Sequence, residues 1–365
     1  MTTLRAISCA GALAATLLFT AATAHGQDLP SLPTYEPGQK VSGTIRNFGS
    51  EMNGLLKIWE AGFKKVQPGV QFDDKFPSSD AWASGLEAGV ADIGTSGREP
   101  ALTEYLSFYE TFNYDPLEIT VATGAYDLKG RTWAEVIYVN KANPISKLTM
   151  KQLDGIFGAA RTGAYRGFKW HPEYARSAKE NIRTWGQLGL TGEWADKPIQ
   201  TYGYAWTGMT NFFQMKVFGG GDKWNENYRQ YAEYGTKMLS DGPGGVTGSI
   251  KHMLTDELSN DKYGIAWTGI PHAADVSGVK AVALAEADGR PYVTPTRETV
   301  QNRTYPLTRS IYFFLKRPPG QALDPKQREF LRYILSRQGQ QDVVRNGNYL
   351  PLTAEVVAEM RRKLE

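Results

Sequence analysis

The chain has 365 residues and a formal charge of only +3, because its 41 lysines and arginines nearly balance its 38 acidic residues. This balance argues against nucleic acid as the main partner. Once the export signal described below is removed, about 340 residues remain, enough for two domains with separate cores. The only cysteine, Cys9, lies inside that signal, so the mature chain has no disulfide and depends on its cores for stability.

The first 24 residues have the pattern of a removable export signal. Arg5 is the only charge before an apolar run, Ala6–Ala24, that ends in small residues. The run is short and rich in alanine, which is typical of a signal peptide cleaved near Ala24 rather than of a retained anchor helix. No later segment is apolar over a membrane-spanning length, and the mean hydropathy is −0.41. We therefore expect a soluble protein in the periplasm or elsewhere outside the cytoplasm.

Residues 25–40 are rich in proline and glycine and are predicted to form an extended leader. After the leader, segments of strand-like and helix-like periodicity alternate along the chain. The predicted strands are 41–49, 70–73, 91–94, 133–140, 197–204 and 263–267, and the predicted helices are 50–65, 79–89, 148–158, 207–218, 325–336 and 353–363. Strands that alternate with helices predict an α/β fold with largely parallel strand pairing.

Small hydroxyl residues stand where three of these segments change from strand to helix or turn. They are Ser50, Ser79 and Ser96. Hydroxyls and backbone amides at helix starts hold small anions without a metal. Arg98 follows the Ser96 turn, and a guanidinium binds an oxyanion through two hydrogen bonds. The alternative interpretation is that the serines cap helices and that Arg98 forms a surface salt bridge.

Motifs for catalysis and for metal binding are absent from the sequence. The four histidines include no HisGluXaaXaaHis motif and no paired metal-ligand spacing, and the chain has no GlyXaaSerXaaGly elbow. Its glycine-rich stretches match no phosphate-loop motif. We therefore predict a protein that is not an enzyme and uses no metal or cofactor, with a secreted phosphatase as the less favoured alternative.

Five sequence segments, taken in order, resemble a known family. They are SerSerAsp with GlyValAlaAspIleGlyThrSerGlyArg (within 78–98), Val139–Gly158, ThrTrpGlyGlnLeu with LysProIleGlnThrTyrGly (within 184–203), TyrProLeuThrArgSerIleTyrPhePhe (305–314) and Gln338–Leu352. Together they resemble the phosphate-binding periplasmic proteins of ABC importers, within the type II periplasmic solute-binding superfamily.

The resemblance implies a two-lobe periplasmic-binding-protein type II fold, with discontinuous lobes joined by two crossover strands. Lobe 1 is expected at 41–128 and 277–365, and lobe 2 at 129–276. An oxyanion is expected in the cleft between the lobes, which would close by hinge motion near 125–135 and 268–280. The resemblance also implies a monomer that captures phosphate or a related oxyanion and delivers it to ABC permease subunits.

The resemblance further implies which residues contact the ligand. The positions that match the family's contacts are Ser50, Ser79, Ser96, Thr207 and Gly208. In addition, Tyr204 and Trp206 would place aromatic surface near the cleft, unless they serve to pack the lobe. Arg309, in TyrProLeuThrArg, is expected to tie the lobes together rather than to touch the ligand.

Two departures from the family pattern bear on the ligand. Many phosphate binders have an acidic residue where this chain has Gly97, and the usual arginine and aspartate before the second-lobe helix are missing from 204–209. A buried acceptor lets a site choose protonated phosphate over sulfate, because sulfate would leave the acceptor facing a lone pair. Phosphate is therefore the leading prediction, and sulfate, another oxyanion, an organic phosphate or a carboxylate remains open. An exported binding or sensor protein without a permease remains open as well.

Overall fold

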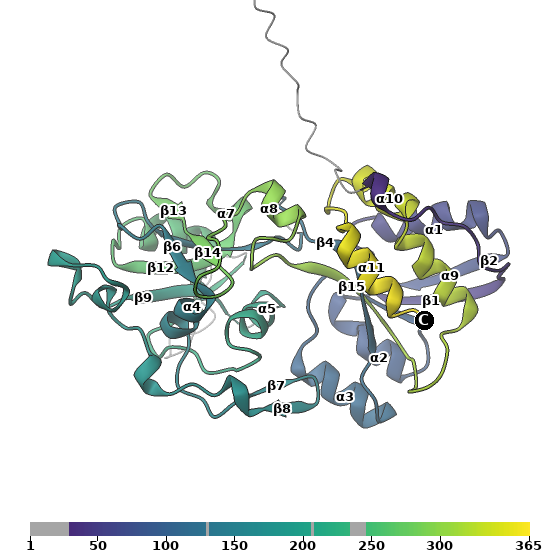
Figure 1. Cartoon of the computed structure of the whole chain (residues 1–365), viewed down its shortest axis with the longest axis horizontal. Coiled ribbons are helices and arrows are strands. Elements are labelled where there is room, and N and C mark those ends of the chain that lie inside the picture. Colours follow the sequence, from purple (N-terminus) through teal and green to yellow (C-terminus); the bar gives the residue numbers. More distant parts are fainter. Residues whose placement is uncertain (1–28, 129–130, 206–207, 234–245) are drawn as a thin grey trace, which may run out of the picture.

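The computed structural model describes residues 29–128, 131–205, 208–233 and 246–365. These residues form two α/β lobes that lie side by side, with the N-terminal leader on the outer surface of one lobe (Figure 1). The predicted α/β class is confirmed. The predicted signal peptide, as well as Trp206 and Thr207, lie outside the described residues.

The first lobe contains a five-stranded mixed sheet. Its strands, in spatial order, are β2 (Val70–Lys75), β1 (Gly43–Gly49), β3 (Ile93–Ser96), β15 (Ser310–Leu315) and β4 (Leu117–Thr123). β1 pairs in parallel with β2 and β3, whereas β15 is antiparallel to β3 and β4. The helices of this lobe are α1 (Leu55–Val66), α2 (Trp82–Glu87), α3 (Leu102–Phe112), α9 (Pro325–Ile334), α10 (Arg337–Asn346) and α11 (Ala354–Arg362).

The second lobe contains a six-stranded sheet. Its strands, in spatial order, are β11 (Val246–Ser249), β10 (Arg229–Ala232), β9 (Gln200–Tyr204), β12 (Gly264–Gly269), β5 (Glu135–Asn140) and β13 (Val279–Ala281). The strands from β11 to β12 run in parallel, and β5 is antiparallel to both of its neighbours. The helices of this lobe are α4 (Met150–Phe157), α5 (Gly208–Val217), α6 (Ile250–His252), a π-helical turn (Met253–Leu258), α7 (Ile270–Ala273) and α8 (Arg297–Gln301).

Two small strand pairs complete the second lobe. β6 (Lys147–Thr149) pairs with β14 (Ala283–Ala285), and β7 (Ala164–Arg166) forms a hairpin with β8 (Lys169–His171). In Figure 1 the β7–β8 hairpin lies beneath the lobe and reaches toward α3 of the first lobe. This hairpin is therefore a second-lobe element at the junction of the two lobes.

Sequence periodicity predicts the position of a helix such as α1 because the helix buries one apolar face. In α1, Leu55, Trp59 and Phe63 are completely buried against the first sheet. The start of α4 has the capping box that its sequence indicates, because Thr149 Oγ1 accepts a hydrogen bond from Gln152 N–H at 3.2 Å. Most predicted elements lie within a few residues of the observed ones.

The first predicted helix starts later than its sequence suggests. The predicted start is Ser50, but α1 begins at Leu55, because Met52, Asn53 and Gly54 have left-handed φ values of 55°, 53° and 83°. Such values are rare for residues other than glycine and are common in loops that serve a site. Ser50 therefore belongs to a loop and does not cap the helix.

The two lobes are joined by two segments that lie against each other. The first is 124–134, between β4 and β5, and the second is 302–309, between α8 and β15. The segments are hydrogen-bonded, because Gly124 N–H donates to Arg309 O at 2.9 Å and Glu135 N–H donates to Leu307 O at 3.1 Å. We propose that these paired crossovers act as the hinge between the lobes.

The prediction that the second crossover lies at 268–280 is wrong. That range contains the end of β12, α7 and part of β13, and β13 pairs with β5 in the second sheet. Val300, Tyr305 and Leu307 also pack in the hydrophobic core of the second lobe. We therefore propose that the second lobe continues through Leu307, whereas the sequence placed its end at 276.

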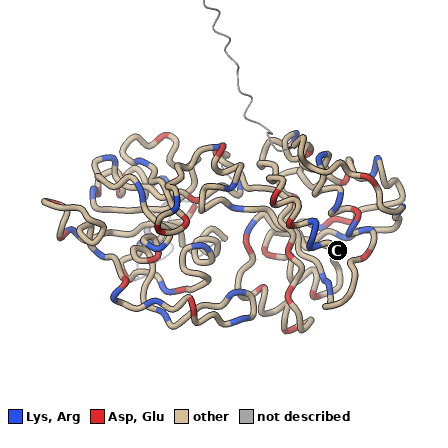
Figure 2. Tube along the Cα trace, viewed as in Figure 1, with Lys and Arg blue, Asp and Glu red and all other residues tan. Residues whose placement is uncertain are grey.

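Charged side chains of both signs are interspersed along both lobes (Figure 2). Among the described residues, no helix combines the length and apolar character needed to cross a membrane.

Candidate functional site

Three hydroxyl groups surround Gly97, in the loop that follows β3. A Cβ atom at Gly97 would lie 3.5 Å from Ser79 Oγ, 3.5 Å from Thr132 Oγ1 and 3.8 Å from Ser50 Oγ. Ser50 follows β1, Ser79 precedes α2, and Thr132 lies in the first crossover. We refer to Ser50, Ser79 and Thr132 as the hydroxyl cluster. The fold thus brings together segments that are far apart in the sequence.

The loop that carries Ser50 is fixed by the neighbouring strand. Ser50 N–H donates to both the carbonyl oxygen and the hydroxyl of Thr95, each at 2.9 Å. Gly49 makes this close approach possible, because its φ is 136° and a Cβ atom there would lie 2.1 Å from Thr95 O. The Ser50 hydroxyl in turn accepts a hydrogen bond from Met52 N–H at 3.2 Å. These contacts hold the Ser50 side chain beside Gly97.

The Ser79 side chain is held by the backbone of Gly97. The residue that caps the turn before α2 is Ser78, whose hydroxyl accepts from Asp80 N–H at 2.9 Å. The alternative interpretation, in which Ser79 caps this helix, is therefore wrong by one residue. The Ser79 hydroxyl instead accepts from Gly97 N–H at 3.1 Å. Ser79 is thus turned toward the loop after β3 rather than toward its own helix.

Ser96 lies next to the cluster but is used within the loop. Its side chain is completely buried, and its hydroxyl lies 3.0 Å from Arg98 O and 3.3 Å from Arg98 N. These contacts shape the turn that presents Gly97. We therefore propose that Ser96 positions the loop and does not itself contact a ligand.

Arg98 is bound by carboxylates of the first lobe. Its guanidinium donates to Asp80 at 2.5 Å and to both oxygens of Glu104 at 2.5 and 3.0 Å. Burial alone would lower the pKa of Arg98, but the hydrogen bonds and charges of Glu104 and Asp80 outweigh burial, and the pKa is raised. The geometry thus agrees with the salt-bridge interpretation, in which Arg98 braces the loop against α3.

The second lobe meets this loop at the start of α5. A Cβ atom at Gly208 would lie 2.6 Å from Arg98 Cδ, so the helix backbone rests directly on the arginine side chain. Gly208 is the first residue of α5. The predicted Thr207, which precedes it, lies outside the described residues. Gly208 is therefore part of the lobe junction. It contacts the Arg98 side chain through its backbone, because glycine has no side chain.

Tyr204 is part of the second-lobe core and does not line the cleft. Its side chain is completely buried, and its hydroxyl lies 2.8 Å from that of Thr268. Its ring packs 5.7 Å from Trp133 and 5.0 Å from Trp267, measured between ring centroids. Lobe packing, the alternative for Tyr204 at the sequence level, is thus the role that its burial supports.

A buried ion pair lies at the lobe junction. The Arg309 guanidinium donates to Glu99 Oε2 at 2.6 and 3.0 Å and also lies 5.5 Å from the Phe212 ring centroid of α5. Arg309 therefore contacts both lobes, in agreement with the role expected for it. Glu135 is nearby and completely buried, and neither carboxyl oxygen has a hydrogen-bond partner among the described residues. Burial raises the pKa of Glu135 well above its usual value, which favours the protonated form.

A cavity of about 200 Å³ lies between the lobes, close to Arg98. Its walls come from the start of α3, from the β7–β8 hairpin and from α5, and include Leu102, Tyr105, Tyr165 and Met215. The hairpin also touches α3 directly, because the rings of Phe168 and Tyr109 stack with centroids 4.0 Å apart and planes at 5°. The lobes therefore meet at the hydroxyl cluster and again at this rim.

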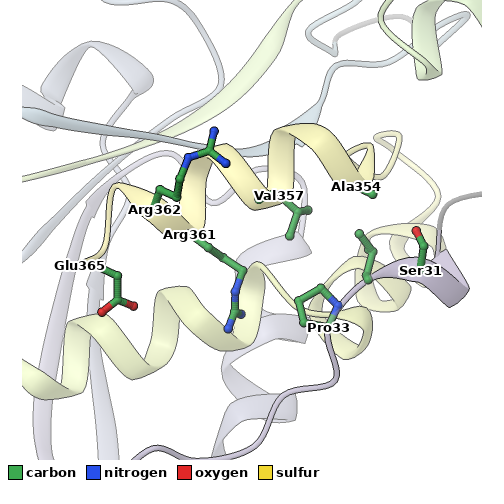
Figure 3. Close-up of a pocket in the computed structure, with 9 residues that line it drawn as sticks. Ser31, Pro33, Ala354, Val357, Arg361, Arg362 and Glu365 are labelled. Atoms are coloured by element: carbon green, nitrogen blue, oxygen red, sulfur yellow. The ribbon is translucent and has the colours of Figure 1, made fainter.

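A larger cavity, of about 540 Å³, lies on the outer surface of the first lobe. Figure 3 shows Ser31 and Pro33 of the leader facing α11, with Arg361 between the helices. The Arg361 guanidinium donates to the Arg332 and Leu335 carbonyls at 3.4 and 3.3 Å. This groove is lined by the leader and the last helix and shares no residue with the hydroxyl cluster.

Metal-binding groups of His, Cys, Asp and Glu are not assembled anywhere among the described residues. The hydroxyl cluster offers hydroxyl groups without a carboxylate, and hydroxyl protons can be donated to an anion.

Sequence reasoning missed Thr132, although it found Ser50 and Ser79. Thr132 lies in a crossover that has no strand or helix periodicity, and its neighbours in space come from other parts of the chain. A threonine in such a segment carries no local signal. Only the fold shows that its hydroxyl reaches Gly97.

Comparison with known proteins places this chain in a family. The PBP superfamily domain matches residues 36–338. The phosphate-binding protein PstS of Pseudomonas aeruginosa strain PAO1 is 31% identical over 337 residues, which span 92% of this chain and 91% of that protein. SphX of Synechococcus elongatus is 23% identical over 226 residues, 61% of this chain and 54% of that protein. A solved structure of PstS from Borrelia burgdorferi overlaps 86% of this chain and 100% of its own, with 17% identity and a TM-score of 0.49.

Proposed function

This chain belongs to the PBP superfamily, and we propose that it binds a small oxyanion, with phosphate as the leading candidate, between its two lobes. The observation that carries the proposal is the hydroxyl cluster, in which three segments each place a hydroxyl within 3.8 Å of one point beside Gly97. The similarity to a phosphate-binding PstS at 31% identity supports the choice of phosphate.

The chemistry of the cluster suits an anion that has lost its water. A buried oxyanion needs several hydrogen-bond donors, and hydroxyls held by backbone contacts supply them at little cost in side-chain entropy. Arg98 contributes no excess positive charge, because it already pairs with two carboxylates, Asp80 and Glu104. Binding would therefore rest on dipoles and hydrogen bonds, which favour a small anion with many acceptor lone pairs.

The physiological role follows from the same proposal. The protein would be exported by a signal peptide cleaved near Ala24, would act outside the cytoplasm as a monomer, and would deliver its ligand to ABC permease subunits. It would bind its ligand without chemical change, in keeping with relatives that are named as binding proteins. Closure about the paired crossovers would couple ligand binding to the shape that a permease recognises.

Isothermal titration with phosphate, sulfate, molybdate and short organic phosphates tests this proposal. We expect saturable binding of phosphate with one ligand per chain. Ser79→Ala should weaken it about 10-fold or more, because a hydrogen bond to a charged ligand is lost. The matched control is Ser84→Ala, since Ser84 lies in the following helix and its hydroxyl donates to Ala81 O at 3.0 Å. No binding of any of these anions, or equal effects of the two variants, would contradict the proposal.

A second candidate ligand is an organic phosphate, and the cavity between the lobes favours it. The cavity of about 200 Å³ lies close to the loop after β3 and has apolar walls from both lobes. An organic group there would add apolar burial to the contacts of the anion. In the same titration, an organic phosphate that binds more tightly than inorganic phosphate would favour this second candidate.

A further inference from the structure

The three hydroxyls around Gly97 differ in what they can offer a ligand. A hydroxyl has one proton to donate and two lone pairs that accept. Which of these remains available depends on the hydrogen bonds that each hydroxyl already makes within the protein. The contacts of the cluster are specific enough to assign those roles.

Ser50 and Ser79 keep their protons for a ligand. The Ser50 hydroxyl accepts from Met52 N–H at 3.2 Å, and the Ser79 hydroxyl accepts from Gly97 N–H at 3.1 Å. A backbone N–H can only donate, so in each case a lone pair is used and the hydroxyl proton is not. Within the described part of the chain, neither hydroxyl donates to an acceptor. Both serines are therefore donors toward the centre of the cluster.

Thr132 has the opposite role. Its hydroxyl donates to the carbonyl oxygen of Gly97. A carbonyl oxygen can only accept, so this bond uses the single proton of the threonine. What remains on Thr132 Oγ1 is lone pairs, and this atom lies 3.5 Å from the Cβ position of Gly97. Toward the centre of the cluster, Thr132 is thus an acceptor.

We propose that Thr132 selects an oxyanion that carries a proton, by accepting a hydrogen bond from the ligand's own hydroxyl. This inference rests on the proposed function and extends it to ligand choice. A carboxylate in the position of Gly97 is absent here, and Thr132 supplies a neutral acceptor beside the same glycine. The cluster then presents two donors and one acceptor, which match hydrogenphosphate or hydrogenarsenate.

Sulfate and selenate fit this arrangement of two donors and one acceptor poorly, because they carry no proton at neutral pH. One of their oxygens would face the lone pairs of Thr132, or Thr132 would turn its proton away from Gly97 O. Either outcome loses a hydrogen bond at a buried position, and Thr132 is only 8% exposed. Such a loss corresponds to a preference for the protonated anion of about 10- to 100-fold.

The test compares four anions on the intact protein by isothermal titration at pH 8. At this pH phosphate carries a charge of roughly −2, as sulfate does, so selectivity does not reflect charge. We expect phosphate and arsenate to bind about 10- to 100-fold more tightly than sulfate and selenate. Thr132→Val keeps the shape of the side chain and should bring the two classes within about 3-fold of each other. Thr132→Ser keeps the hydroxyl and should retain the wild-type preference.

Ser79→Ala is the matched control within the cluster. It removes a donor that both kinds of anion use, so both affinities should fall while their ratio stays unchanged. An unchanged ratio in Thr132→Val, or a collapsed ratio in Ser79→Ala, would overturn the role of Thr132. If Thr132→Val does not fold, the four anions on the wild-type protein still decide the question, because equal affinities contradict the inference. Failure of all four anions to bind would instead contradict the proposed function itself.

Discussion

The two lobes present different side chains where they meet. The first lobe contributes Ser50, Ser79 and Gly97 on loops whose backbone is tightly constrained, and part of that backbone is left-handed. The second lobe contributes a block of packed aromatic rings that includes a residue of α5. We define this aromatic block as Trp133, Tyr204, Phe213, Trp224, Tyr228 and Trp267.

This difference suggests that the first lobe provides ligand contacts and that the second lobe provides rigidity. The small residues of the first lobe bring hydroxyls close to Gly97, whereas the large rings in the block fill the space around one another. Trp133, Tyr204, Phe213 and Trp267 are all buried to 99% or more. We therefore expect the first lobe to provide the hydroxyls for a ligand and the second lobe to support α5 at the lobe junction. Variants in the aromatic block should lower stability and leave ligand affinity nearly unchanged. Variants beside Gly97 should lower ligand affinity and leave stability nearly unchanged.

The largest effect is expected from Trp267→Ala, in the aromatic block. Trp267 is completely buried, and its ring stacks on Phe213 with centroids 4.7 Å apart. The variant should lower the free energy of unfolding by about 3–5 kcal/mol, because it leaves a cavity. Phosphate affinity, measured by titration at a temperature where the variant is folded, should change by less than about 3-fold, since no ring of the block would contact the anion. A large loss of affinity would place the block at the site.

A buried acid of the first lobe gives the next effect, as a dependence of stability on pH. Burial, with the nearby charge of Asp74, raises the pKa of Glu60 to about 7, although Lys57 opposes the shift. The folded state therefore binds the proton more tightly than the unfolded chain does. This contribution is fully present below the unfolded pKa of about 4.5 and is lost as the pH rises through about 7.

Chemical denaturation between pH 4.5 and pH 8 measures this contribution. Glu60→Gln has no proton to lose, so it should remove up to about 3 kcal/mol of the fall in stability over that range. The variant lies away from the hydroxyl cluster, so phosphate affinity should stay as in the wild type. An unchanged pH profile would show that Glu60 titrates normally.

Gly97→Ala should have the reverse signature of the tryptophan variant. Its new methyl group would lie 3.5 Å from Ser79 Oγ and Thr132 Oγ1, an ordinary contact distance that the fold tolerates. The methyl group would also occupy the point toward which the hydroxyls converge. Phosphate affinity should fall about 100-fold or more, through the loss of several hydrogen bonds to a charged ligand, while the melting temperature stays within a few degrees. Wild-type affinity in this variant would remove Gly97 from the site.

The smallest effect is expected at the rim of the lobe junction. Phe168 stacks on Tyr109 across the two lobes and remains 46% exposed. An aromatic pair of this kind contributes about 0.5–1.5 kcal/mol, so Phe168→Ala should weaken ligand binding about 3-fold if the stack forms only in the closed state. Tyr109→Ala should give the same loss, and the double variant should add little to either. Additive losses would show that the two rings act separately.

Sequence periodicity was sufficient for many of the elements, although it missed α3, β4, β15 and α10, and it was not sufficient for the loops of the site. The strands and helices follow from repeating apolar positions, which is why β1, α4 and α9 lie close to their predicted ranges. The second crossover was misplaced because 302–309 has neither strand nor helix periodicity, whereas 268–280 contains short elements that look like a connection. The pairing of β13 with β5 is a long-range contact that no local pattern reveals.

The candidate site was predictable in part for the same reason. Ser50 and Ser79 could be found because they follow or precede regular elements and match a family pattern. Thr132 could not be found, because its role depends on the crossover passing next to Gly97. The role of Arg98 depends on Glu104, one turn into α3, and on Asp80 before α2. Tyr204 was expected near the cleft because strand position alone does not say which face of a strand is covered.

The most direct test of the central claim is a crystal structure of the protein grown with phosphate. The expected result is one anion between the lobes, with its oxygens about 2.5–3.0 Å from the hydroxyls of Ser50, Ser79 and Thr132. Phosphate bound elsewhere, with only water beside Gly97, would contradict the claim that this cluster is the binding site.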